Sequence, residues 1–104
     1  MRIAAAQILT GRDPQDNLRL VRESVAEAAA QSARIVVFPE ATMRAFGAGR
    51  LDEIAEPLDG PWATGVAEAA REHGVVVVVG MFTPGEGGRV RNTLLVTGPD
   101  EARP

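Results

Sequence analysis

The sequence predicts an α/β fold whose strands and helices follow the order β-α-β-α-β-β. Two segments have apolar residues at helical spacing, and each is followed by an unbroken apolar run typical of a strand in a parallel sheet. The crossover in such a strand–helix–strand unit is right-handed in nearly all proteins, and ligands of open parallel sheets bind beyond the carboxyl ends of the strands. A length of 104 residues accommodates a single domain.

Residues 2–8 are predicted to form a buried first strand, because a short apolar run with branched residues at each end suits that position. A helix is expected to begin at Asp13, which can cap the free amides, with Pro14 in the first helical position. It is expected to run to about Ser32. Its apolar stripe consists of Leu18, Val21, Val25 and Ala28.

Residues 33–38 form a continuous apolar run, and we expect this second strand to be covered on both faces. The strand leads into Pro39 and Glu40, so Glu40 is predicted to lie where functional groups collect. Residues 43–58 are predicted to be a loop with one short helical turn at residues 52–55, long enough to form the wall of a pocket.

A second helix is expected to begin at residues 59–61 and to end at Gly74, which suits a left-handed stop. Residues 75–82 are predicted to form a third, buried strand. After a turn rich in glycine, residues 89–97 pair back as an antiparallel fourth strand, and residues 98–100 begin another turn. One face of the second helix carries Trp62, Val66, Ala69, Ala70 and His73.

The composition excludes several classes of function. Only 4% of the residues are aromatic, and the net charge is -3, so neither base stacking nor attraction to phosphate backbones is expected. Nucleic acid and anionic membranes are therefore excluded as partners. With no cysteine and one histidine, neither a disulfide framework nor a thiolate or His-rich metal site is expected.

The longest apolar run, residues 75–79, is too short to cross a bilayer, and no leader peptide is recognised, so we expect a soluble cytoplasmic protein. All eleven basic residues are arginine, and the chain has no lysine.

Five short motifs, in order along nearly the whole chain, resemble the N-terminal part of the carbon–nitrogen hydrolases of the nitrilase superfamily. They are the opening strand at residues 1–7, Phe38-Pro39-Glu40 after the second strand, Leu58-Asp59-Gly60-Pro61 before the second helix, Gly80 with Arg91-Asn92-Thr93, and Gly98-Pro99-Asp100.

The resemblance implies that residues 1–104 are an incomplete carbon–nitrogen hydrolase domain, the N-terminal portion of an αββα sandwich. It also implies a Glu-Lys-Cys triad that attacks a small amide or nitrile through a thioester, without a metal or organic cofactor, in a protein that forms homo-oligomers when full length. Glu40 would be its general base, screened from water at the end of a buried strand. Asn92 is expected to serve as a strand-end hydrogen-bonding residue or to support the pocket, and Arg44 and Phe46 either line the pocket or organise its loop.

The chain departs from the family pattern because it contains neither the lysine nor the cysteine, so we expect it to be inactive alone. One alternative is a catalytically dead interaction module, or a split subunit whose sandwich is completed by a partner chain. The coding sequence after Pro104 distinguishes the two: an in-frame lysine and a later cysteine indicate the hydrolase, and a stop codon with a neighbouring gene that encodes the remainder indicates the module. A nucleotide-binding domain is the weakest alternative, because Gly11 stands alone after the first strand.

Overall fold

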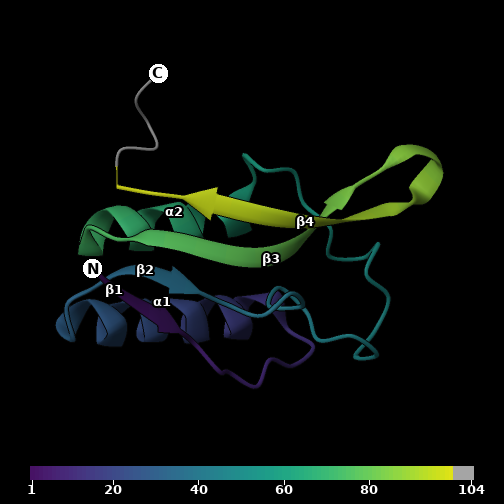
Figure 1. The fold of residues 1–104 in the computed structure, drawn as a ribbon. Coiled ribbons are helices and arrows are strands. Elements are labelled where there is room, and N and C mark those ends of the chain that lie inside the picture. The colour runs from purple at the N-terminus through teal and green to yellow at the C-terminus, as the bar shows by residue number, and fades with distance from the viewer. Residues whose placement is uncertain (100–104) are drawn as a thin grey trace.

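The computed structural model describes residues 1–99, and its elements follow the predicted order (Figure 1). The strands are β1 (Arg2–Ala5), β2 (Ala33–Val37), β3 (Val76–Pro84) and β4 (Val90–Thr97), and the helices are α1 (Pro14–Ala30) and α2 (Pro61–His73). A short 3₁₀ turn, η1 (Glu86–Gly88), connects β3 to β4. The strands form one sheet in the order β1-β2-β3-β4, parallel except for β4, which is antiparallel to β3. The last residue of the turn predicted at residues 98–100 lies outside the described residues.

Helix α1 begins as its sequence predicts. Asp13 is its N-cap, and its carboxylate accepts a hydrogen bond of 2.9 Å from the amide of Gln15, while Pro14 occupies the first turn. The predicted apolar stripe is buried along its whole length and comprises Leu18, Val21, Val25 and Ala28. The helix therefore packs by the amphipathic pattern of its sequence.

Helix α2 begins at a residue without a capping side chain. Its N-cap is Gly60, and the carboxylate of Glu56 supplies the missing acceptor by receiving a 2.8 Å hydrogen bond from the amide of Trp62. The indole of Trp62 is fully buried and donates from Nε1 to the Pro14 carbonyl oxygen at 2.9 Å, which ties the two helices together at their first turns. The helix ends at Gly74, whose φ of 66° is left-handed, as predicted.

Both helices contribute to one hydrophobic core on a single face of the sheet. Their buried residues pack against alternate positions of the central strands, among them Val36, Val77, Val79 and Met81, all fully buried. The opposite face follows the other register positions: Ala5 pairs with Val37, Val37 with Val78, and Val78 with Val96. On this second face Ile3 is 60% exposed, Leu94 64% and Val96 53%, so it is an uncovered apolar surface.

Two expectations about burial are wrong. The second strand is covered on one face only, since Val37 is 37% exposed on the uncovered face. The first strand ends at Ala5 and not at Ile8, and it lies at the edge of the sheet, where most of its residues are exposed. A continuous apolar run predicts a strand that is covered on both faces, but it does not identify the covering segment. Within residues 1–99, no second layer lies on the face of the sheet opposite the helices.

The segment between β2 and α2 is a loop, as predicted. Its one helical turn is closed by a 3.1 Å hydrogen bond from the amide of Ala55 to the carbonyl of Leu51, next to the predicted position. The loop is fastened to the sheet where the amide of Glu56 donates to the Phe82 carbonyl at 3.0 Å.

Candidate active site

Glu40 lies just beyond the carboxyl end of β2, in a turn that is held on both sides. The amide of Phe38 still donates to the Val78 carbonyl at 2.8 Å, so the chain stays attached to β3 up to that residue. Beyond it, the hydroxyl of Thr42 donates to the Pro39 carbonyl at 2.6 Å, and the hydroxyl of Thr10 donates to the Ala41 carbonyl at 3.1 Å. The backbone of Glu40 is therefore fixed by bonds to its immediate neighbours.

The second determinant of the site is Gly80, in the middle of β3. A Cβ built at this position would lie 1.7 Å from the carbonyl oxygen of Glu40 and 2.7 Å from its Cα. Those atoms belong to backbone and not to a flexible side chain, so no other residue fits without moving Glu40. The absence of a side chain here is what lets the turn lie directly against the sheet.

Asn92 of β4 reaches the same place from the other side. The antiparallel register pairs Phe82 with Asn92 and Gly80 with Leu94, which puts Asn92 on the same face of the sheet as Gly80. Its side-chain amide Nδ2 donates a hydrogen bond to Glu40 Oε1, across 52 residues of sequence. The structure thus brings together two of the predicted site residues, Glu40 and Asn92.

A hollow of about 410 Å³ surrounds this pair, and its lining consists of Phe38, Glu40, Gly80, Asn92, Thr93 and Leu94. Glu40 itself is exposed. The expectation that it is screened from water is therefore wrong for the described residues, because the hollow opens on the uncovered face of the sheet. The carboxylate does lie at a concavity and beside neighbouring strands, which is where a functional group of an open sheet is expected.

Arg44 is not part of this lining. It is buried, with 6% of its surface exposed, and its guanidinium is used to organise the loop. Its Nε donates to the Arg12 carbonyl at 2.7 Å, and its Nη1 donates to the Arg50 carbonyl at 2.7 Å and to the Glu53 carboxylate at 3.3 Å. Arg44 was expected either to line the pocket or to organise its loop, and these contacts correspond to the second role.

Phe46 also lies outside the lining of the hollow. It is 59% exposed, and its ring packs edge to face on Phe82, with 5.8 Å between the ring centroids. Since Phe82 is the register partner of Asn92, this aromatic pair borders the site along β3.

Two residues that shape the site were not singled out for that role. Gly80 stands alone within an apolar strand, and a glycine inside a strand is a signal for close approach of another backbone. Asn17 is 1% exposed within the predicted apolar stripe of α1. It accepts from the Gly11 amide at 2.9 Å and donates to the Gly11 and Met43 carbonyls at 3.0 Å each, so it links the loops before α1 and after Glu40.

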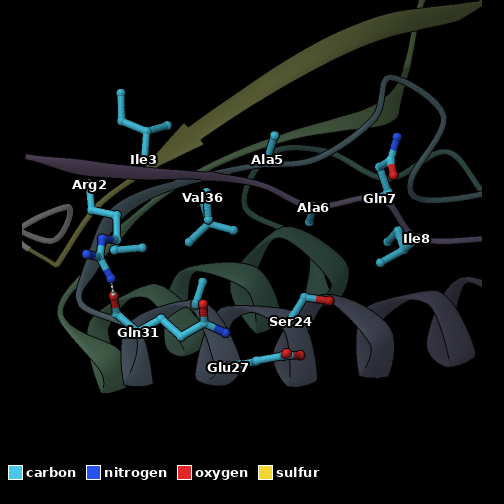
Figure 2. Close-up of a pocket in the computed structure, with 13 residues that line it drawn as sticks. Arg2, Ile3, Ala5, Ala6, Gln7, Ile8, Ser24, Glu27, Gln31 and Val36 are labelled. Atoms are coloured by element: carbon cyan, nitrogen blue, oxygen red, sulfur yellow. Dashed lines mark hydrogen bonds between the residues drawn. The ribbon is translucent and has the colours of Figure 1, made fainter.

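A second hollow, of about 360 Å³, lies between the edge strand β1 and helix α1 (Figure 2). Ala6 and Val36 point toward the helix there, while Ile3 and Ala5 point away from it to the uncovered face. It shares no lining residue with the hollow around Glu40. Its polar groups come mainly from α1 and its C-terminal end, with Arg2 donating to the Gln31 carbonyl at 2.7 Å.

Among residues 1–99, no three His, Cys, Asp or Glu side chains are grouped so that they could hold a metal ion. No helix within this described range is long and apolar enough to cross a membrane.

Comparison with known proteins gives a consistent result. The chain is 56% identical over 99 residues to a hydrolase of Mycobacterium tuberculosis, and 35% identical over 99 residues to the ω-amidase of Danio rerio. The matched segment is 95% of this chain in both cases, but only 35% and 36% of the relatives, so the chain spans about a third of the curated relatives it matches.

The fold matches that of a solved protein of the CN-hydrolase superfamily from Xanthomonas campestris. The TM-score is 0.83 at 28% sequence identity, and the match covers 98% of this chain and 38% of the other. The family description Carbon-nitrogen hydrolase fits residues 2–102, which is nearly the whole chain. This protein belongs to the carbon–nitrogen hydrolase family.

Proposed function

We propose that residues 1–104 are the N-terminal part of an amidase-type hydrolase that cleaves non-peptide carbon–nitrogen bonds in small amides, with Glu40 as its general base. The observation that carries this proposal is the position of Glu40 in a hollow beyond the end of β2, hydrogen-bonded to Asn92 and packed against Gly80. The ω-amidase among the relatives supports a small amide as the substrate class.

In the proposed reaction, Glu40 takes the proton of a cysteine thiol as the sulfur bonds to the amide carbon. A lysine stabilises the negative charge that develops on the oxygen. Glu40 then returns the proton to the nitrogen, the carbon–nitrogen bond breaks, and ammonia or an amine leaves a thioester. Glu40 next removes a proton from water, whose oxygen attacks the thioester. The carbon–sulfur bond breaks to release the acid, and Glu40 returns its proton to the sulfur to restore the thiol.

Neither the lysine nor the cysteine is among the 104 residues, so the proposal requires a longer chain or a second one to supply both. We therefore predict no amide hydrolysis by the 104-residue polypeptide alone. The same dependence makes the test direct, because activity must appear when the missing groups are supplied and must still require Glu40.

The test uses a complete enzyme, either the full coding sequence that contains these residues or this chain continued by the remaining part of the Mycobacterium tuberculosis hydrolase. Release of ammonia from a panel of small ω-amides is measured for the wild type and for Glu40→Gln, which keeps the size of the side chain but removes the base. We expect Glu40→Gln to lose at least 100-fold in kcat, since general base catalysis contributes about 10²- to 10⁴-fold. Wild-type activity in Glu40→Gln would contradict the proposal.

The uncovered sheet face favours one second candidate, an interaction module that joins a partner chain. Ile3, Leu94 and Val96 give it an apolar surface of the kind that marks association sites. A stop codon directly after Pro104, with a folded complex formed with a separately encoded chain, would favour this candidate over a single-chain enzyme.

A further inference from the structure

We propose that Asn92 is a positioning residue that holds Glu40 through Oε1 and so reserves Oε2 as the oxygen that exchanges the proton. This inference rests on the proposed function of Glu40 as a general base. It goes further by assigning separate tasks to the two carboxylate oxygens and by naming the residue that separates them.

The backbone of Glu40 is held in place and cannot shift to accommodate different positions of its side chain. Gly80 lies against it so closely that not even a methyl group fits between them, and hydrogen bonds of Thr42 and Thr10 fix the residues on either side. The remaining freedom of the carboxylate is rotation about its side-chain bonds. A single hydrogen bond to Oε1 is enough to restrict that rotation.

Asn92 is itself well placed to act as a fixed hydrogen-bond donor. It lies within the paired part of β4, opposite Phe82, and not in a loop. Phe82 is 1% exposed and its ring packs on Phe46, so the strand position opposite Asn92 is held by the loop that follows Glu40. A donor on a paired strand keeps its direction better than a donor on a loop, which is what orientation of a reacting group requires.

The charges around the hollow are few. Apart from Glu40, the residues that line it are uncharged, namely Phe38, Gly80, Asn92, Thr93 and Leu94. The buried cation of the adjoining loop, Arg44, is bonded to the carbonyls of Arg12 and Arg50 and to the Glu53 carboxylate. On β4, the neighbouring Arg91 pairs with Thr83 and belongs to the opposite face of the strand.

A neutral donor is suited to the task because it orients a carboxylate without the large loss of basicity that a cation causes. An arginine next to a carboxylate typically lowers the carboxylate pKa by about 1–3 units, which would hold it in the charged form and weaken it as a base. One amide hydrogen bond fixes Oε1 and leaves the lone pairs of Oε2 for the thiol or water. In the complete enzyme, the lysine and cysteine of the proposed reaction are the additional titratable groups that face Glu40.

The experiment measures pH–rate profiles of kcat/KM for the complete enzyme described above and for two variants. Asn92→Asp keeps the shape of the side chain but replaces the donor by a second carboxylate, and Asn92→Ala removes the donor. Both changes make the charged form of Glu40 less favourable, so the acid limb of the profile should move to higher pH, by about one unit or more for Asn92→Asp and by less for Asn92→Ala. We expect kcat to fall by about 10- to 100-fold in both variants, with KM changing less than about twofold.

Arg89→Gln is the matched control, since it removes a charge from the exposed hairpin end of the sheet without touching the lining of the hollow. Its profile should coincide with that of the wild type. Thermal melting of each variant shows whether the fold is kept, and Asn92→Ser provides a second donor-altered variant if Asn92→Asp does not fold.

The outcomes separate the two proposals. Unchanged profiles and kcat in folded Asn92 variants, together with an inactive Glu40→Gln, would overturn the role of Asn92 and leave the function of Glu40 standing. The role of Asn92 would also be overturned if kcat falls together with the melting temperature while the acid limb stays in place. That result would indicate that Asn92 is needed only for the fold. An active Glu40→Gln would overturn both proposals.

Discussion

The carbonyl of Glu40 packs directly against the Cα of Gly80. A Cβ on residue 80 would lie only 1.7 Å from the Glu40 carbonyl oxygen, which leaves no room for a side chain. Backbone, and not a side chain, stands in the way, so a larger residue must push the turn off the sheet. This contact makes the placement of a carboxylate just beyond the end of one strand depend on the absence of a side chain on the next strand.

Gly80→Ala should therefore damage the site and the fold together. We expect a loss of about 1–3 kcal/mol in the free energy of unfolding, the usual cost of overpacking, measured by urea denaturation. In the complete enzyme kcat should fall by at least tenfold, because Glu40 is displaced. The control is Gly11→Ala, where an added Cβ meets no atom within 4 Å. Equal stability and activity of the two variants would contradict this explanation.

Asn17→Ala should destabilise the protein by about 1–3 kcal/mol, because it leaves the buried Met43 carbonyl and both polar groups of Gly11 without their side-chain partner. Chemical denaturation of the variant measures the change. Gln15→Ala, an exposed substitution on the same helix, should change the free energy of unfolding by less than about 0.5 kcal/mol. A similar small effect for Asn17→Ala would mean that water replaces its hydrogen bonds.

The isolated 104-residue polypeptide should self-associate as its concentration rises, because the uncovered sheet face presents a continuous apolar surface. Sedimentation velocity at several concentrations measures this. The double substitution Leu94→Ser with Val96→Thr should shift the distribution toward monomer. Leu9→Ser should not, since Leu9 is 95% exposed but lies in the loop before α1. A monomeric wild type at all concentrations would contradict the prediction.

The exposed ion pair of Arg50 and Asp52 gives a prediction for pH. The guanidinium donates from Nε and Nη2 to the two carboxylate oxygens, at 3.0 and 2.6 Å, and these bonds lower the pKa of Asp52 below its ordinary value of 3.8. Because the pKa is depressed in the folded state, any stabilisation is present above the ordinary value and is lost as the pH falls through the folded pKa.

In Arg50→Gln, the pKa of Asp52 should rise toward 3.8. Titration of the carboxyl carbon by NMR follows this change. Arg34→Gln, which removes an exposed charge from β2, is the control and should leave the Asp52 titration unaltered. Since both side chains are exposed to solvent, the titration should be sensitive to salt.

The order of the elements and the buried stripe of α1 could be predicted because they depend on local periodicity. Leu18, Val21 and Val25 recur on one face of any helix that contains them, whatever lies opposite. The caps at Asp13 and Gly74 are equally local, since each depends on one residue and its immediate neighbours. These features were confirmed at the predicted positions.

Contacts between distant segments were harder to predict. The bond from Asn92 to Glu40 depends on the β3–β4 register, and the burial of Arg44 depends on two loops, one before α1 and one before α2, that meet at its guanidinium. The exposure of Val37 was missed for a different reason. An unbroken apolar strand sequence predicts that both faces of the strand are covered. It does not identify the chain segment that covers each face.

The uncovered face of the sheet has a chemical consequence as well as a structural one. The side chains of Glu40 and Leu94 line the same hollow on the uncovered face of the sheet. A protein layer that buries this face therefore also removes water from the Glu40 carboxylate. Under the proposed function, the reactivity of Glu40 would then arise only upon assembly. An unassembled chain would keep this carboxylate hydrated and idle.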